Sequence, residues 1–124
     1  MINAIIIDDE QHCSDRLSSL LQENHQDIIN LCGAFSDIEK GLSAIIKLHP
    51  QLVFLDVQIH DKTGFDLLKQ LPKIDFDIIF TTAYEKYAVQ AIKFSALDYL
   101  LKPVTQEDLG FAINKSAEKN KLND

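Results

Sequence analysis

Four short runs of consecutive apolar residues constrain the fold of this chain more than any other feature of its sequence. They cover residues 4–7, 52–55, 78–80 and 99–101. Runs that are apolar throughout, rather than at alternate positions, are typical of strands covered on both faces. A weaker run over residues 28–32 contains Asn30 and indicates an edge strand. The sequence therefore predicts five strands.

Segments with the apolar spacing of helices follow these runs. They cover about residues 13–21, 36–49, 65–71, 87–92 and 105–113. We expect a capping box of Ser36 and Glu39 to open the second helix and Thr105 to cap the fifth. In the fourth, we expect one side of the helix to hold Tyr87, Ala88, Ala91 and Ile92. Strict alternation of strand and helix implies right-handed crossovers. The predicted fold class is α/β, a doubly wound, five-stranded parallel sheet with (βα)5 topology.

Length and composition limit the possible functions. A chain of 124 residues with 46% hydrophobic residues fits one domain with its own core. The formal charge is −7 and Arg16 is the only arginine, which disfavours nucleic-acid binding by this segment. No run is long and apolar enough to span a membrane, so we expect no membrane partner and a cytoplasmic location. We expect Cys13 and Cys32 to be reduced packing thiols.

Polar residues follow four of the predicted strands at the point where each strand ends. They are Asp8, Asp9 and Glu10, then Asp56, then Thr81 and Thr82, and finally Lys102 and Pro103. Each group alone is also typical of a helix cap or a turn. Together they should converge, because ligands of such sheets bind outside the carboxyl ends of the strands. Two carboxylates 4 Å apart repel each other by about 4 kcal/mol at an effective dielectric of 20. Oxygen ligands and scattered histidines favour Mg²⁺ or Mn²⁺ over zinc as the neutralising cation.

Five motifs in this order resemble the receiver domain of two-component response regulators. They are Ile7-Asp8-Asp9-Glu10, Leu55-Asp56-Val57-Gln58, Gly64, Thr82-Ala83 and the segment from Asp98 to Pro103. The residues around 83–88, 91–92 and 96–99 further resemble the LytTR-type (LytR/AlgR-like) subclass. The resemblance implies a flavodoxin-like strand order, 2-1-3-4-5. It also implies a receiver domain over residues 1–118, with 119–124 as a helix end or the start of a linker.

The resemblance implies that Asp56 is the phosphoacceptor of a sensor histidine kinase, and so becomes a 4-aspartylphosphate. Asp9 and Asp56 would bind Mg²⁺ directly, the backbone carbonyl of Gln58 would be a third ligand, and Asp8 would act through water. Lys102 would pair with a phosphoryl oxygen, and its bond to Pro103 would be cis.

Two further residues match the switch positions of the family. The hydroxyl of Thr82 would hydrogen bond to the phosphoryl group, and Tyr99 would swing inward. His60 departs from the pattern, because the fourth position past the phosphoacceptor is commonly proline. We expect the His60→Pro substitution to change the dephosphorylation rate.

The resemblance also implies how the signal leaves the domain. We expect a homodimer through the face of the fourth helix, fifth strand and fifth helix. DNA contact would belong to a LytTR-type output domain absent from this chain. We expect no enzymatic activity beyond the domain's own phosphorylation and dephosphorylation.

Several other classes compete with this interpretation. A stand-alone receiver and a pseudo-receiver without phosphoryl chemistry would share the fold. A phosphatase of the haloacid dehalogenase type would need a second Asp where Gln58 stands. A flavodoxin-like nucleotide or flavin binder would need a phosphate loop after the first strand, whereas the acidic residues there repel phosphate.

Overall fold

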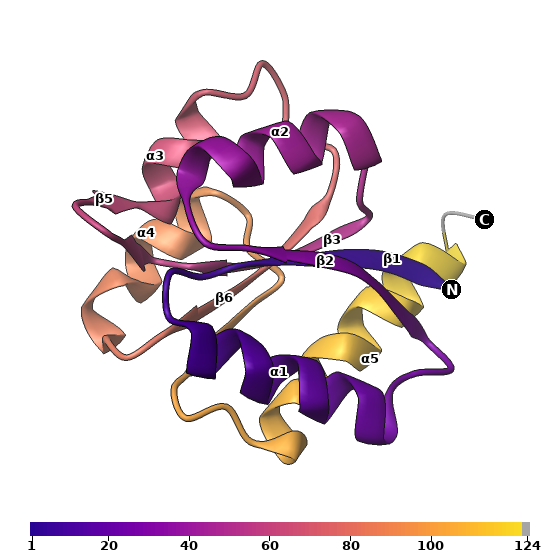
Figure 1. The fold of residues 1–124 in the computed structure, drawn as a ribbon. Coiled ribbons are helices and arrows are strands. Elements are labelled where there is room, and N and C mark those ends of the chain that lie inside the picture. The colour runs from indigo at the N-terminus through magenta and orange to yellow at the C-terminus, as the bar shows by residue number, and fades with distance from the viewer. Residues whose placement is uncertain (123–124) are drawn as a thin grey trace.

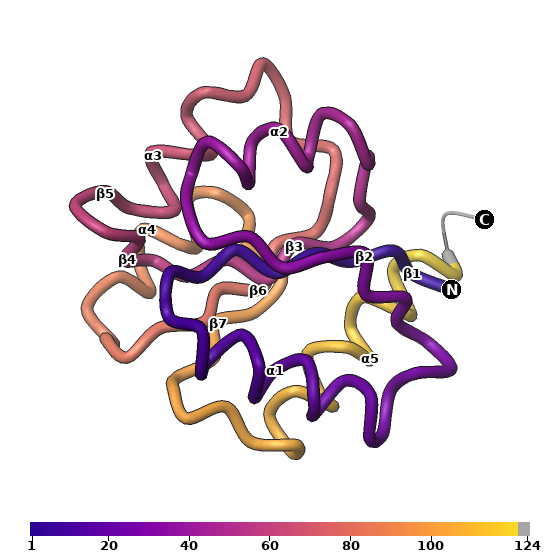
Figure 2. Tube along the Cα trace, in the orientation of Figure 1, coloured from indigo at the N-terminus to yellow at the C-terminus, as the bar shows by residue number. Residues whose placement is uncertain are grey.

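Five parallel strands form the central sheet of the computed structural model, which describes residues 1–122. The strands are β1 (Ile2–Ile7), β2 (Ile29–Phe35), β3 (Leu52–Asp56), β6 (Asp77–Thr82) and β7 (Asp98–Leu101). Their order across the sheet is β2-β1-β3-β6-β7. Since these are the five predicted strands in chain order, the predicted order 2-1-3-4-5 is confirmed. The carboxyl ends of all five strands lie at one end of the molecule (Figure 2).

Helices cover both faces of the sheet (Figure 1). They are α1 (Gln11–Asn24), α2 (Ile38–Leu48), α3 (Gly64–Lys69), α4 (Ala88–Lys93) and α5 (Gln106–Leu122), with a 3₁₀ turn at Glu85–Tyr87. One core lies between the sheet and α1 and α5, and a second lies under α2, α3 and α4. The central strand β3 is buried along its whole length. This two-sided burial explains why the strand residues are apolar without alternation.

The structure adds one element that the sequence pattern does not predict. Two short antiparallel strands, β4 (Gln58–Ile59) and β5 (Lys62–Thr63), form a small hairpin between β3 and α3. The edge strand β2 also runs to Phe35, three residues beyond the predicted end. The helix α3 begins at Gly64 and ends at Lys69, whereas the sequence predicts about 65–71. The differences in β2 and α3 lie at the ends of these elements, where the boundaries of strands and helices are least well defined.

The prediction that Ser36 and Glu39 form a capping box is wrong. The helix begins one residue later than that box requires, and the Asp37 side chain accepts a hydrogen bond of 2.7 Å from the Lys40 N–H. A capping box does occur at α3, where Thr63 and Asp66 exchange side-chain and backbone hydrogen bonds. In both helices, the cap is therefore the side-chain oxygen of the residue just before the first helical residue.

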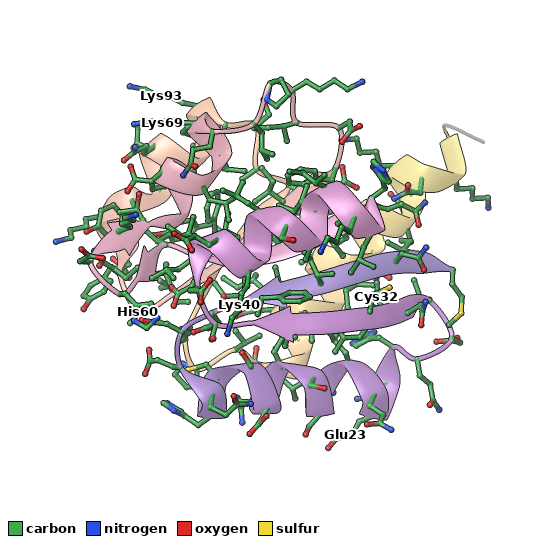
Figure 3. The ribbon with its side chains drawn as sticks, turned by 45° about the horizontal axis from the view of Figure 1, so that its top comes forward. Glu23, Cys32, Lys40, His60, Lys69 and Lys93 are labelled. Atoms are coloured by element: carbon green, nitrogen blue, oxygen red, sulfur yellow. The ribbon has the colours of Figure 1, made fainter. Side chains whose placement is uncertain are left out.

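Two predictions about burial are also wrong. Ile92, expected on the same side of α4 as Ala91, is 73% exposed, whereas Ala91 is buried. Cys32 is exposed on the edge strand β2, and Cys13 is only half-buried, so Cys32 is not a packing thiol. In Figure 3, Cys32 lies on β2, well away from His60 in the loop at the site end of the sheet.

A buried polar cluster anchors α5 to the start of β6. Asp77 is 8% exposed and accepts hydrogen bonds from Ser116 Oγ at 3.1 Å and from Lys119 Nζ at 2.7 Å. Asn120 Nδ2 donates to the Ser116 carbonyl at 2.8 Å.

The helix α5 continues to Leu122, and the last two residues of the predicted helix end or linker lie outside the described residues. Within residues 1–122, no helix has the length and hydropathy needed to cross a bilayer.

Candidate functional site

The predicted acidic residues meet at the carboxyl end of the sheet. Asp8 follows β1 and Asp56 ends β3, and these two strands pair side by side through Ile7 and Leu55. Asp8 is 4% exposed and Asp56 is 3% exposed. Together with Asp9 and Glu10, they offer carboxylate oxygens that all lie within 4.8 Å of one another. Adjacent parallel strands therefore concentrate negative charge in one place.

Lys102 reaches into this acidic group from the end of β7. Its backbone N–H donates to the Thr82 carbonyl at 2.8 Å, which fixes the chain beside β6. Its Nζ lies 2.9 Å from Asp8 Oδ2 and 3.0 Å from Asp56 Oδ2, and 3.7 Å from Glu10 Oε1. The Lys102–Pro103 peptide bond is cis, as expected. One ammonium thus bridges the two buried carboxylates.

The charges in this site perturb one another. Burial and the neighbouring charge of Asp8 raise the pKa of Asp56 to about 7, although hydrogen bonding to Lys102 opposes the rise. Burial would lower the pKa of Lys102, but its hydrogen bonds to Asp8 and Asp56 outweigh burial, and the pKa lies above its ordinary value. Lys102 therefore stays charged. Its single positive charge does not balance the negative charge of the four carboxylates.

The donor set fits a hard divalent cation. Carboxylates from two strand ends supply the oxygen ligands that Mg²⁺ prefers, and an ion there would relieve their repulsion. Asp9 Oδ2 accepts a hydrogen bond of 2.8 Å from the His60 N–H. Gln58, expected to contribute its carbonyl, donates its backbone N–H to Asp56 Oδ1 at 3.3 Å. The structure therefore brings together Asp8, Asp9 and Asp56, and places Gln58 beside them.

The two expected switch residues lie near each other on β6 and β7. Thr82 is fully buried at the end of β6, and its Oγ1 accepts from the Tyr84 N–H at 3.3 Å. The Tyr99 ring packs on Phe80 with centroids 6.2 Å apart, and its hydroxyl donates to the Tyr84 carbonyl. Burial raises the pKa of the Tyr99 phenol. Both residues thus hold the loop that begins after β6.

Two residues shape the loop after Asp56 in ways that the sequence did not reveal. His60 has a positive φ of 55°, and its ring Nε2 lies 3.1 Å from the Ser36 carbonyl. A proline there would have neither this φ nor the N–H that binds Asp9. A Cβ on Gly64 would lie 2.5 Å from the Asp56 carbonyl oxygen, so only glycine lets α3 begin this close to Asp56.

Comparison with known proteins identifies this architecture. The model of the response regulator receiver domain matches residues 4–114. A response regulatory protein of Vibrio cholerae, described as uncharacterized, is 39% identical over 125 residues, which is 100% of this chain and 52% of that protein. The sensory transduction protein LytT of Bacillus subtilis is 35% identical over 98% of this chain and 50% of its own length. The chain thus spans about half the length of these relatives.

The solved structures agree with the sequence comparison. The response regulator receiver domain protein of Clostridium thermocellum superposes with a TM-score of 0.84 and 28% identity, and the match covers 100% of both chains. The chain belongs to the response regulator receiver domain family. Its resemblance to LytT and LytR proteins is consistent with a receiver of the LytTR type.

Proposed function

We propose that this domain is a Mg²⁺-dependent phosphoacceptor in which Asp56 receives a phosphoryl group from a sensor histidine kinase. The observation that carries the proposal is the bridge from Lys102 Nζ to Asp56 Oδ2 at 3.0 Å and to Asp8 Oδ2 at 2.9 Å. A purely structural ion pair would need one carboxylate, whereas this site gathers two buried ones and two more beside them. Such an excess of acid is costly without a function for it.

Phosphoryl transfer requires little covalent chemistry from the protein beyond the attack by Asp56. An Asp56 oxygen attacks the phosphorus of a phosphohistidine, an O–P bond forms, and the P–N bond breaks to leave the imidazole. Bound Mg²⁺ would neutralise charge on the transferred oxygens. Lys102 is placed to bind another of these oxygens, because its ammonium already lies within hydrogen-bond distance of Asp56. The residues act by position and charge, and the domain catalyses only its own phosphorylation and dephosphorylation.

The phosphorylated state is proposed to be read through Thr82 and Tyr99. A phosphoryl group on Asp56 adds a charge of about −1.5 to −2 and new acceptor oxygens. The buried Thr82 hydroxyl accepts a 3.3 Å hydrogen bond from the Tyr84 N–H, and its own proton is the one that it would donate to the phosphoryl group. Movement of Thr82 would free the Tyr84 loop and change the packing of Tyr99, which binds the same loop. This is a shift between two populations of one fold.

The output is proposed to lie in the half of the relatives' length that this chain does not span. The names LytT and LytR support a LytTR-type DNA-binding domain there, acting in transcription regulation. We also propose a homodimer through α4, β7 and α5, because each of these elements carries exposed apolar side chains: Val89, Ile92, Leu101 and Phe111. Sedimentation showing a monomer in both phosphorylation states would count against the dimer. The cytoplasmic location stays a prediction.

The decisive experiment measures the intact mass of the protein after incubation with acetyl phosphate, with Mg²⁺ or with EDTA. We expect one phosphoryl group that requires both Mg²⁺ and Asp56, so that it is absent from Asp56→Asn. The matched control is Asp27→Asn, which removes an exposed carboxylate and should leave the adduct intact.

The opposite result has a clear meaning. A wild-type protein that binds Mg²⁺ but gives no adduct and no response to beryllofluoride would be a pseudo-receiver. An adduct that persists in Asp56→Asn would assign the phosphoacceptor to another residue.

A further inference from the structure

A second group of metal-ligating side chains lies beside the acidic site and has different chemistry. Glu10, His12 and Cys13 each offer a ligand atom, and these atoms all lie within 4.8 Å of one another. His12 Nε2 is 3.6 Å from Glu10 Oε2. A carboxylate, an imidazole and a sulfur at this spacing form a mixed donor set. The Mg²⁺ ligands proposed above are oxygens only.

Backbone hydrogen bonds fix the positions of these three residues in the chain. Glu10 is the N-cap of α1, and its carbonyl accepts hydrogen bonds from the Cys13 N–H at 3.1 Å and the Ser14 N–H at 3.2 Å. These bonds close the first turn of a 14-residue helix, so the three positions do not depend on a mobile loop. A metal would therefore find its ligands on one side of a turn that is already formed, which lowers the entropic cost of binding.

The three side chains also border an open space. A hollow of about 320 Å³ is lined by Glu10, His12 and Cys13 together with Asp8 and Lys102. It has room for an ion and the water molecules that would complete its coordination. The guanidinium of Arg16, which also lines the hollow, is held by two hydrogen bonds to the Val104 carbonyl at 3.0 and 2.7 Å.

The local charge favours a second cation. Four carboxylates lie within 4.8 Å of one another and are opposed by the ammonium of Lys102. A bound Mg²⁺ would still leave one negative charge uncompensated. Burial and the charges of Asp8 and Glu10 raise the pKa of the Cys13 thiol, so the sulfur adds no charge until it binds a cation, and that cation would offset the remaining charge.

We propose that Glu10, His12 and Cys13 form a binding site for one thiophilic divalent cation, Zn²⁺, next to the phosphoacceptor site. Imidazole and thiolate ligands select Zn²⁺ over Mg²⁺, and three protein ligands with an open fourth position are usual in zinc sites that keep a water. Binding forms Zn–S, Zn–N and Zn–O bonds, and the Cys13 thiol releases its proton to solvent. The site does not rest on phosphorylation, and its ligands differ from those of the Mg²⁺ site.

The test uses Co²⁺ as a spectroscopic probe, in the presence of a reductant and saturating Mg²⁺ so that the oxygen site is filled. Coordination by Cys13 should give a near-ultraviolet sulfur-to-cobalt charge-transfer band that reaches its plateau at one equivalent. One equivalent of Zn²⁺ should abolish the band. Co²⁺ in a site made only of oxygen ligands gives no such band, so the signal reports a sulfur ligand and not the Mg²⁺ site.

Variants assign the ligands. Cys13→Ser should abolish the band, while Cys32→Ser is the matched control and should keep it. His12→Gln changes an exposed side chain and should weaken Zn²⁺ binding by more than about tenfold, because even the loss of a residue that only orients a metal ligand costs about 10–100-fold. Asp56→Asn should leave the band unchanged. A missing band in the folded wild-type protein, or a band that follows Cys32 or is unaffected by His12→Gln, would overturn the proposal.

Discussion

In the absence of Mg²⁺, replacing Asp56 by asparagine is expected to stabilise the domain more at pH 8 than at pH 5. Burial and the charge of Asp8 raise the pKa of Asp56 from 3.8 to about 7 in the folded state. Between these two values, the folded protein keeps a proton that the unfolded chain has released. The free energy of unfolding of the wild type therefore falls as the pH rises through this window. Asparagine cannot titrate, so the free energy of unfolding of the variant does not fall in this way.

The raised pKa sets the size of the effect. A shift from 3.8 to about 7 is worth about 4 kcal/mol over the whole window, of which about 3 kcal/mol lies between pH 5 and pH 8. Domains of this size are stable by only about 5–15 kcal/mol, so the effect is large. With a urea m-value of about 1–3 kcal/mol per molar, the wild-type midpoint should fall by about 1–3 M relative to the variant.

The assay is urea unfolding in EDTA, followed by circular dichroism for both proteins from pH 5 to pH 8. Groups outside the site titrate in both proteins and cancel in the difference. Asp27→Asn serves as the control for loss of an exposed charge. Adding Mg²⁺ at pH 8 should restore wild-type stability, because the ion binds only the folded, ionised site. A difference between the two proteins that stays constant over this pH range would refute the reasoning.

Two further substitutions test the packing around the site. Gly64→Ala should lower the free energy of unfolding by about 1–3 kcal/mol, because its Cβ would lie 2.5 Å from the Asp56 carbonyl oxygen. The same change at Gly110, whose nearest contact would be 3.8 Å away, should not destabilise the domain, and equal losses at both positions would contradict the argument. Tyr99→Phe removes the hydrogen bond to the Tyr84 carbonyl and should cost about 1 kcal/mol, with faster amide exchange in the Tyr84 loop. Unchanged exchange there would show that the hydroxyl does not hold the loop.

The sequence predicts the sheet and the convergence of the acidic residues because both depend on few physical rules. Buried strands must be apolar, and parallel strands must end at one edge. Asp8 and Lys102 directly follow strands and Asp56 ends one, so the strand order alone predicts that they lie close together, and their side chains meet at 2.9 and 3.0 Å. The cis bond at Pro103 was expected from the family resemblance alone.

Other features depend on local geometry that residue types do not encode. Ser36 and Asp37 are both good N-caps, and the start of the helix at Ile38 decides between them. His60 could not be assigned a contact, because its bond to Asp9 joins residues 51 positions apart. Glu10, His12 and Cys13 are neighbours in sequence, yet only the first turn of α1 shows that their ligand atoms face one another.

The anchoring of Asp77 has a mechanical consequence for the whole domain. Asp77 and Thr82 are the first and last residues of the same strand, β6, and Asp77 is tied to the C-terminal half of α5. Because β6 also pairs with β3 and β7 along its length, it is a rigid link between the acidic site at one end and α5 at the other. We expect a displacement of Thr82 to be opposed at Asp77 by these contacts with residues 116–119 of α5.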